Sequence, residues 1–192
     1  MLAVAIASAC AVLYVGMVAR HVKGPARVVK VVPALALVTL LPSPALAAAM
    51  VFSALGDAFL LDKARFFLPG LGAFLVAHLC FMGGFLSLSG EAPGQPVLIG
   101  VSIAAAAVLT SLWPGLRGPL RVAVPVYAFA LAGMVASAST LGALGFLGGV
   151  VFLVSDTLLA FNLFRGPLPG ADVPVMITYF AAIGLLTASV LT

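Results

Sequence analysis

Charge is what this sequence has least of. Of its 192 residues only 7% are Asp, Glu, Lys or Arg, whereas 64% are hydrophobic, and the mean hydropathy is +1.31. A soluble domain carries about 25% charged residues, so this chain has too few polar side chains to cover a surface that faces water. The composition excludes a soluble globular protein and predicts one integral membrane domain over residues 1–192.

Cysteine and histidine are also scarce, with two residues of each. Cys10 and Cys80 fall inside apolar segments, where a thiol serves as a small packing residue. His21 lies in a loop and His78 in an apolar segment, so no Cys/His spacing typical of a metal site exists, and no phosphate-binding glycine motif is found. We therefore expect no metal and no cofactor. The net charge of +4 comes from short loops and does not indicate a nucleic-acid partner.

Long apolar runs are what the sequence has instead. A membrane helix needs roughly 20 apolar residues, and the runs between the Pro, Gly and charged breaks predict an all-α, polytopic protein with eight transmembrane helices. The second helix is short, and we expect it to be tilted or only partly exposed to lipid. The charged residues from Asp62 to Arg65 are expected to form the loop after the third helix. The expected helices cover residues 2–19, 28–41, 45–61, 66–88, 96–113, 122–137, 143–164 and 173–191.

The positions of Lys and Arg support this number of helices. Four of the nine follow the first helix, two the third, two the fifth and one the seventh, and none lies in another loop or at a terminus. Cytoplasmic loops carry the excess of basic residues in membrane proteins. The alternation therefore predicts both termini outside, all basic loops in the cytoplasm, and a multi-pass location in the cell inner (plasma) membrane.

Two aspartates lie inside the predicted helices, where ionisable groups are costly and usually functional. Asp57 lies five residues before Asp62, about 7.5 Å along a helix, and Asp156 lies somewhat deeper, nine residues before Arg165. At similar depths on helices of the same direction they can face one cavity. Close carboxylates in a low dielectric do not both ionise, which provides an acid and a base. The alternative is a structural carboxylate bonded to a neighbouring helix, with Lys30 as a partner.

Five further polar residues are candidates for substrate binding. His78 lies near the middle of its helix, where it either titrates or donates a hydrogen bond across helices. Lys30 stands near the membrane boundary, where it snorkels or pairs with a phosphate or carboxylate. Tyr127, Asn162 and Tyr179 are more often interhelical hydrogen bonders than catalysts, but a shared cavity would bring several of them together.

A weak internal repeat relates the two halves of the chain. Val51-Phe52 precedes Gly56-Asp57 much as Val151-Phe152 precedes Ser155-Asp156. Likewise, Lys30-Val-Val-Pro33 matches Val122-Ala-Val-Pro125. The match predicts two parallel four-helix repeats in which the third and seventh helices are equivalent. Chance similarity between two apolar sequences is the alternative.

In the order of its polar motifs, the chain resembles the YhhN family, which includes the TMEM86-type lysoplasmalogenases. The resemblance covers nearly the whole chain. One departure is Cys80-Phe81, where an aromatic such as Tyr is expected soon after the histidine. The stretches that carry the resemblance are Lys30-Val-Val-Pro33, Leu55-Gly-Asp-Ala-Phe-Leu-Leu61 running on to Gly70-Leu-Gly-Ala-Phe-Leu-Val-Ala-His78, Pro125-Val-Tyr127, and Phe152-Leu-Val-Ser-Asp-Thr-Leu-Leu-Ala160 with Asn162, Phe164 and Thr178-Tyr179.

The resemblance implies a hydrolase that cleaves the vinyl ether bond of lysoplasmalogens to a fatty aldehyde and a glycerophospho-ethanolamine or -choline. This reaction needs a general acid and a carboxylate that stabilises a cation and orients water, and it needs no metal. Asp57 and Asp156 would share these tasks, and the sequence does not assign either task to one of the two. His78 and Tyr179 would support them, and Lys30 would bind the lipid phosphate.

Three other functions remain as alternatives. An intramembrane aspartyl protease also uses two aspartates, but Asp57 follows Ala-Leu-Gly rather than Gly-x-Gly, and Asp156 follows Ser rather than Tyr. A small transporter or proton-coupled carrier would use the aspartates as protonation sites. A lysolipid-binding protein without enzyme activity would bind the same lipid and release no aldehyde.

Overall fold

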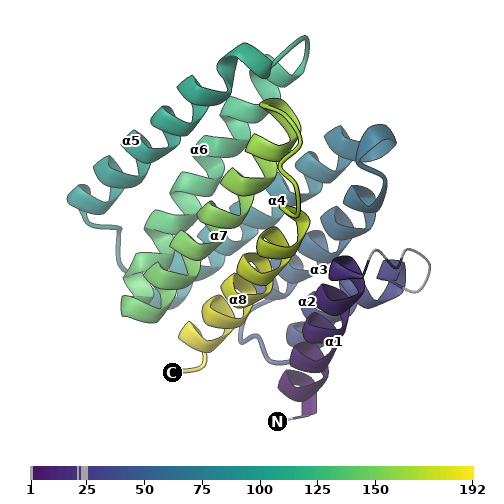
Figure 1. Cartoon of the computed structure of the whole chain (residues 1–192). Helices are drawn as coiled ribbons and strands as arrows, with labels where there is room; N and C mark the ends of the chain where they lie inside the picture. Colours follow the sequence, from purple (N-terminus) through teal and green to yellow (C-terminus); the bar gives the residue numbers. More distant parts are fainter. Residues whose placement is uncertain (1, 21, 23–25) are drawn as a thin grey trace.

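Figure 1 shows the computed structural model, in which antiparallel helices pack side by side. The structure describes residues 2–20, 22 and 26–192, and at residues 26–28 and 64 it describes the backbone alone. Within these residues it contains no β-strand, so the all-helical prediction is confirmed. The α-helices are α1 (Leu2–Ala19), α2 (Ala26–Val38), α3 (Pro44–Phe59), α4 (Lys63–Ser89), α5 (Gln95–Leu112), α6 (Leu120–Ala138), α7 (Gly142–Phe164) and α8 (Asp172–Ser189).

By length and composition, six helical stretches of the described residues are apolar enough to cross a membrane. One of them, Leu120–Phe164, contains both α6 and α7, which are joined by the short 3₁₀-helix η3 (Ser139–Leu141). The apolar part of α2, Val29–Val38, is shorter than a spanning helix. Large apolar side chains stay exposed, for example Leu2 at 76% and Val12 at 74%. Such a surface is suited to lipid and not to water.

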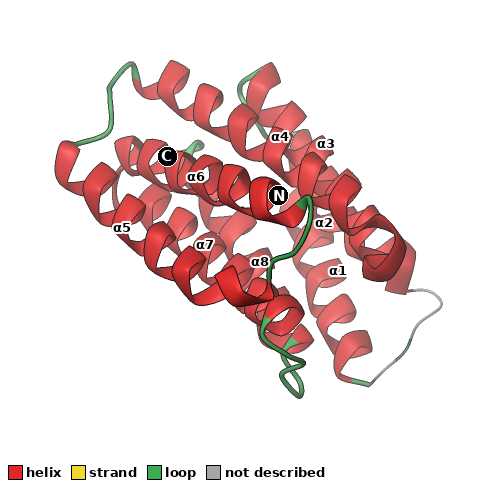
Figure 2. Cartoon of the chain, turned by 90° about the horizontal axis from the view of Figure 1, so that it is seen from above, coloured by secondary structure: helices red, strands yellow, loops and turns green. Residues whose placement is uncertain are grey.

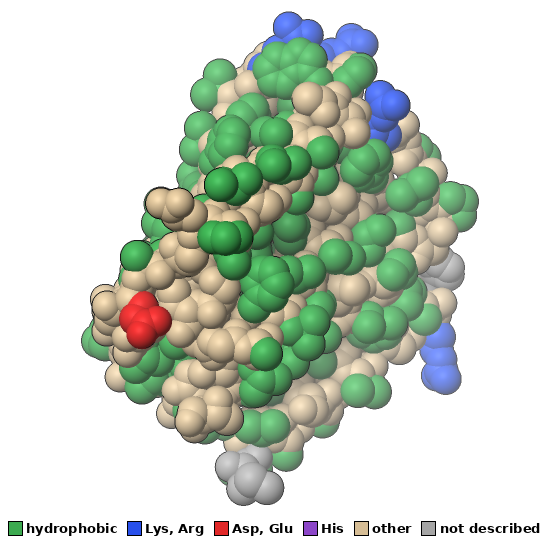
Figure 3. All heavy atoms as spheres, turned by 90° about the vertical axis from the view of Figure 1, so that its left-hand side faces the viewer, with side chains coloured by type: hydrophobic (Ala, Val, Ile, Leu, Met, Phe, Trp, Pro, Cys, Tyr) green, Lys and Arg blue, Asp and Glu red, His purple; other side chains and the backbone are tan. Residues whose placement is uncertain are grey.

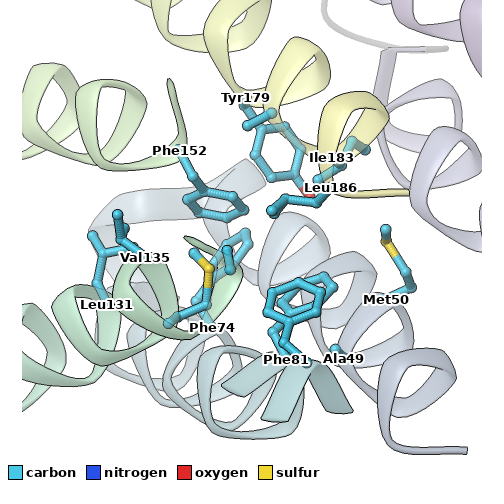
Figure 4. Packing of buried hydrophobic residues seen from close by; sticks show 14 of the residues in the cluster. Ala49, Met50, Phe74, Phe81, Leu131, Val135, Phe152, Tyr179, Ile183 and Leu186 are labelled. Carbon is cyan, nitrogen blue, oxygen red and sulfur yellow. The ribbon is translucent and has the colours of Figure 1, made fainter. Parts of the chain in front are cut away.

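The helices form a bundle in which α5 and α1 lie at opposite edges (Figures 1 and 2). Helix α3 packs along α4, α7 along α8, and α4 reaches across the bundle to α6. Helix α1 contacts α2 and α8, and both termini lie at the same end (Figure 1). This order places α3, α4, α6, α7 and α8 around a common centre, which holds the buried core shown in Figure 4.

Small residues allow the backbones of α6, α7 and α8 to approach closely. A Cβ atom added at Gly145 would lie 2.2 Å from the carbonyl oxygen of Ala138, and one at Gly149 would lie 3.1 Å from Cα of Val135. Interfaces between membrane helices favour such residues because packing, rather than the exclusion of water, holds them together. The glycines of α7 therefore serve packing.

The charged segment after α3 differs from its prediction. Instead of a loop, the 3₁₀-helix η1 (Leu60–Asp62) leads directly to α4. Asp62, whose φ of −121° and ψ of 76° are not helical, caps α4 by accepting a hydrogen bond of 3.3 Å from the Arg65 backbone N–H. The break falls at Phe66, whose φ of −119° and ψ of 22° are not helical. Pro69 explains its place, since proline has no N–H to donate to the Arg65 carbonyl.

Among the basic residues that the structure describes, Lys63 and Arg65 lie in the first turn of α4, Arg117 lies between α5 and α6, Arg121 lies in the first turn of α6, and Arg165 follows α7. On the face drawn in Figure 3, basic side chains lie toward the top and right edge, and hydrophobic side chains cover most of the area between them and an acidic group on the opposite side. In the loop after α1, His21 and Lys23 lie outside the described residues, as does the side chain of Arg27.

Candidate active site

Asp57 lies near the end of α3 and is almost fully enclosed. Its Oδ1 is 3.0 Å from Nζ of Lys30 on α2, and the two side chains are 2% and 4% exposed. Tyr179 on α8 donates its hydroxyl hydrogen to Asp57 Oδ2 at 2.7 Å. Lys30 also donates to the carbonyl oxygen of Asp57 at 3.4 Å. Both carboxylate oxygens therefore have a donor, as a buried charge requires.

Asp156, on α7, has a different set of partners. The hydroxyl of Tyr127 on α6 donates to Asp156 Oδ2. Nε2 of His78 on α4 lies 2.9 Å from the same hydroxyl and 3.8 Å from Asp156 Oδ2. A tyrosine has one hydroxyl hydrogen, so His78 Nε2 carries the hydrogen that Tyr127 accepts. The result is a chain of donors from His78 through Tyr127 to Asp156.

Asp156 also differs from Asp57 in what it leaves open. Its side chain is 17% exposed, and none of the described residues donates a hydrogen bond to its Oδ1. His78 is fully buried, and its Nδ1 has no hydrogen-bond partner among the described residues. Asp156 therefore has one carboxyl oxygen without a donor among the described residues, whereas both oxygens of Asp57 have one.

Aromatic rings fill the space between the two aspartate clusters. The ring of Phe152 meets that of His78 at 5.0 Å between centroids and that of Tyr179 at 5.6 Å, both edge to face. Phe74 meets Tyr179 at 6.0 Å from the other side. Figure 4 shows Phe152, Tyr179 and Phe74 turned toward one another from three different helices. These contacts hold the rings in place and surround the carboxylates with an apolar wall.

One cavity joins the two clusters. It encloses about 910 Å³ of space between the side chains, its open mouth included. Asp57, Lys30 and Tyr179 line it together with Asp156 and Tyr127, so both aspartates face one space. The rest of the lining is mostly apolar and comes chiefly from α4, α5, α6 and α7: Phe67, Leu71, Val108, Leu109, Leu112, Leu131, Leu153, Leu163 and Phe164.

The sequence model of the YhhN family matches residues 25–190 of the chain. The chain belongs to the YhhN family. It is 38% identical to the pig protein named lysoplasmalogenase TMEM86B, over 84% of this chain and 74% of that protein. It is 35% identical to the human TMEM86B, over 74% of this chain and 62% of that protein. A protein of Mycobacterium tuberculosis named lysoplasmalogenase is 37% identical over 64% of this chain and 50% of that protein.

The match between this YhhN chain and its curated relatives is partial along their length. It spans about three fifths of the human protein and half of the mycobacterial one. No solved structure matches the chain.

Six of the seven residues expected from sequence lie in the two aspartate clusters of this YhhN protein, and five of the six line the cavity. His78 does not line it and reaches it only through Tyr127. Asp57 and Lys30 meet Tyr179, and Asp156 meets Tyr127 and His78. The structure does not bring Asn162 to the cavity lining. Its Oδ1 accepts a hydrogen bond of 2.8 Å from the backbone N–H of Leu168, so it holds the loop after α7.

Sequence reasoning missed the apolar wall of this YhhN site. In the sequence, Phe152 is part of the repeat and of the family resemblance, and the α5 residues are part of a membrane helix; neither pattern predicts that these residues surround a site. A signal was present, because Ala105, Val108, Leu109 and Leu112 recur at the spacing of one helix face. In a helix that is apolar on every side, that spacing does not mark which face lines a cavity.

Proposed function

We propose that this YhhN protein is a lysoplasmalogenase, which hydrolyses the vinyl ether bond of a lysoplasmalogen to a fatty aldehyde and a glycerophospho-head group. The observation that carries the proposal is that two aspartates, each bonded to a tyrosine, face one largely apolar cavity. The names of the relatives, lysoplasmalogenase in each case, support it.

The reaction needs two carboxylate tasks. A general acid protonates the alkenyl carbon β to the ether oxygen, which leaves an oxocarbenium ion. Water then adds to the carbon next to the oxygen and loses its proton to a base. The hemiacetal collapses to the aldehyde and the free glycerol hydroxyl. An apolar, preorganised site favours both the proton transfer and the stabilisation of the cation.

The geometry supports a division of these tasks. Asp156 is the acid, because it lines the cavity, Tyr127 occupies its Oδ2, and none of the described residues donates to its Oδ1, which is left to carry the proton. Once it has given up this proton, Asp156 accepts one from the attacking water. Asp57 remains the fixed anion that stabilises the oxocarbenium ion, since Lys30 and Tyr179 hold both of its oxygens. His78 positions Tyr127 and so orients Asp156.

The proposal extends to the topology. We infer eight spans in one membrane domain, with both termini outside and the basic loops in the cytoplasm of a cell inner membrane. Eight of the nine Lys and Arg residues lie in the α1–α2, α3–α4, α5–α6 and α7–α8 connections or within three residues of them, and the ninth is Lys30 on α2. A lysolipid of the cytoplasmic leaflet would then reach the aspartates at their depth below the basic loops.

The partners of the aspartates support two parallel repeats. Asp57 on α3 takes Lys30 from α2 and Tyr179 from α8. Asp156 on α7 takes Tyr127 from α6 and His78 from α4. Exchanging α1–α4 with α5–α8 converts one set of helices into the other, as two related halves require.

The test is aldehyde release from an alkenyl-glycerophosphocholine by the purified protein. Asp57→Asn and Asp156→Asn should each lower kcat/KM by about 10²-fold or more, because each removes an acid, base or fixed charge. Asp172→Asn is the matched control, since its carboxylate is 59% exposed at the start of α8 and should leave the rate unchanged. A parent protein that folds, binds the lysolipid and releases no aldehyde would contradict the proposal.

A further inference from the structure

A groove between α5 and α7 leads away from the site. Its lining carries no polar side chain. Leu153 lines both this groove and the cavity that holds the aspartates, so the two spaces are neighbours on either side of this side chain. The groove residues are Pro96, Val97, Gly100, Val101 and Ala104 on α5, and Phe146, Val150 and Leu153 on α7.

The α7 side of the groove leads along the helix toward Asp156. Phe146, Val150 and Leu153 follow one another at spacings of four and three residues, and Asp156 comes three residues later. Phe146, Val150 and Leu153 share one helix face, and Asp156 lies next to Leu153, turned by about 60° around the helix. The apolar stripe therefore ends beside Asp156.

The α5 side is open because of a glycine. Gly100 is exposed, and a Cβ atom added there would meet no other heavy atom within 4 Å. Helix α5 packs chiefly on α6 and stands at the edge of the bundle (Figure 1). The face of the molecule drawn in Figure 3 is largely hydrophobic between its charged groups.

We propose that this α5–α7 groove binds the hydrocarbon chain of the lysolipid, with the vinyl ether at Asp156 and the chain end near Phe146. The identity of the lipid rests on the proposed lysoplasmalogenase function. The position of the groove beside the cavity, with Leu153 shared by both linings, selects this occupant. From Asp156 to Phe146 the helix rises about 15 Å over ten residues, which matches the reach of roughly a dozen methylene groups.

The proposal also orients the lipid. The groove runs from the aspartates toward the beginnings of α5 and α7, away from the basic loops at their far ends. A lipid whose head group stays at the basic end therefore has its vinyl ether at the aspartates and its chain directed across the bilayer. The opposite orientation would place the chain beside Leu112 and Phe164 instead.

The first test is Gly100→Leu, which fills the middle of the groove. We expect kcat/KM for a sixteen-carbon alkenyl chain to fall by roughly 10- to 100-fold, because a displaced chain shifts the vinyl ether from the acid. A chain of about five carbons ends before Gly100 and should react as with the parent. The matched control is Gly184→Leu, at an exposed glycine five residues from the end of α8 with equally open surroundings. Ala104→Leu is the second groove variant if Gly100→Leu does not fold.

The second test does not depend on turnover. An alkyl ether analogue of the lysolipid with a diazirine at about the twelfth carbon is photolysed with the parent protein, and the labelled peptides are mapped. We expect labels within residues 95–104 and 146–153, lost when excess unlabelled lysolipid is added. Labelling that is not competed would mean a bilayer lipid in the groove, and labels near Leu112 and Phe164 would mean the opposite orientation; either result overturns the proposal. A parent without aldehyde release but with competed groove labels would overturn the hydrolase function and leave the groove assignment standing.

Discussion

The buried ion pair between Lys30 and Asp57 gives the sharpest prediction. Lys30→Met removes the ammonium group but keeps much of the side-chain volume, and it leaves the Asp57 carboxylate 2% exposed with Tyr179 as its remaining side-chain donor. Removing one partner of a buried pair costs roughly 3–5 kcal/mol of the free energy of unfolding. Asp57→Asn should cost a similar amount, because it leaves the ammonium group without a counter-ion.

The double variant decides whether the loss comes from charge. With Met at position 30 and Asn at position 57, no charge remains, and the amide oxygen still accepts from the Tyr179 hydroxyl. Replacing both members of a buried pair is often neutral, so the double variant should unfold within about 1 kcal/mol of the parent. The two single losses should therefore not add.

The assay is denaturant-induced unfolding in detergent micelles, followed by circular dichroism on the parent, both single variants and the double variant. A Lys30→Met protein that unfolds like the parent, with KM raised by tenfold or more for phosphate-bearing substrates, would refute the reasoning. Lys30 would then be a ligand of the lipid phosphate, as the sequence alone suggested, and not the counter-ion of Asp57.

Three further predictions concern packing, positioning and the surface. Gly145→Ala should lower the free energy of unfolding by about 1–3 kcal/mol, because its Cβ would lie 2.2 Å from a backbone oxygen that has no room to move, that of Ala138. Tyr127→Phe should lower kcat by roughly tenfold or more with little change in KM, since it breaks the donor chain that orients Asp156. Lys63→Ala should change the free energy of unfolding by less than about 1 kcal/mol, because its ion pair with Asp172 is exposed.

Each of the three has its own check. Gly72→Ala is the matched control for the packing variant, since a Cβ there meets nothing within 4 Å; equal loss in both would contradict the packing argument. For Tyr127→Phe, steady-state kinetics with an unchanged melting temperature separates positioning from unfolding. For Lys63→Ala, a loss of several kcal/mol would mean that the α4–α8 contact holds the fold.

The features predicted well from sequence depend on local patterns. Apolar length and the placement of Lys and Arg predict helices whose bounds fall within a few residues of those observed. The intramembrane cost of charge singles out Asp57 and Asp156. The partners of these aspartates depend on how each helix is rotated against its neighbours, which local periodicity does not determine when every face is apolar. Asn162 shows this, since a polar residue near the site proved to hold a loop.

The break in α4 was predicted less well for a different reason. Three charged residues and an alanine, at positions 62–65, suggest a loop, but one of them, Asp62, caps the helix that follows. The choice between a loop and a capped helix depends on a hydrogen bond to the backbone three residues later. The kink at Phe66 then depends on Pro69, whose effect falls on the preceding turn.

The crossing of partners between the two halves has a consequence for how the protein is made. When only α1–α4 have left the ribosome, Asp57 has Lys30 beside it but not Tyr179, and His78 has neither Tyr127 nor Asp156. These four helices hold an incomplete polar cluster, and α8, which follows every other helix of the site in the chain, brings the missing hydroxyl. Assembly of the site therefore waits for α8, and two fragments divided between α4 and α5 would have to find each other in the bilayer before either aspartate had all of its partners.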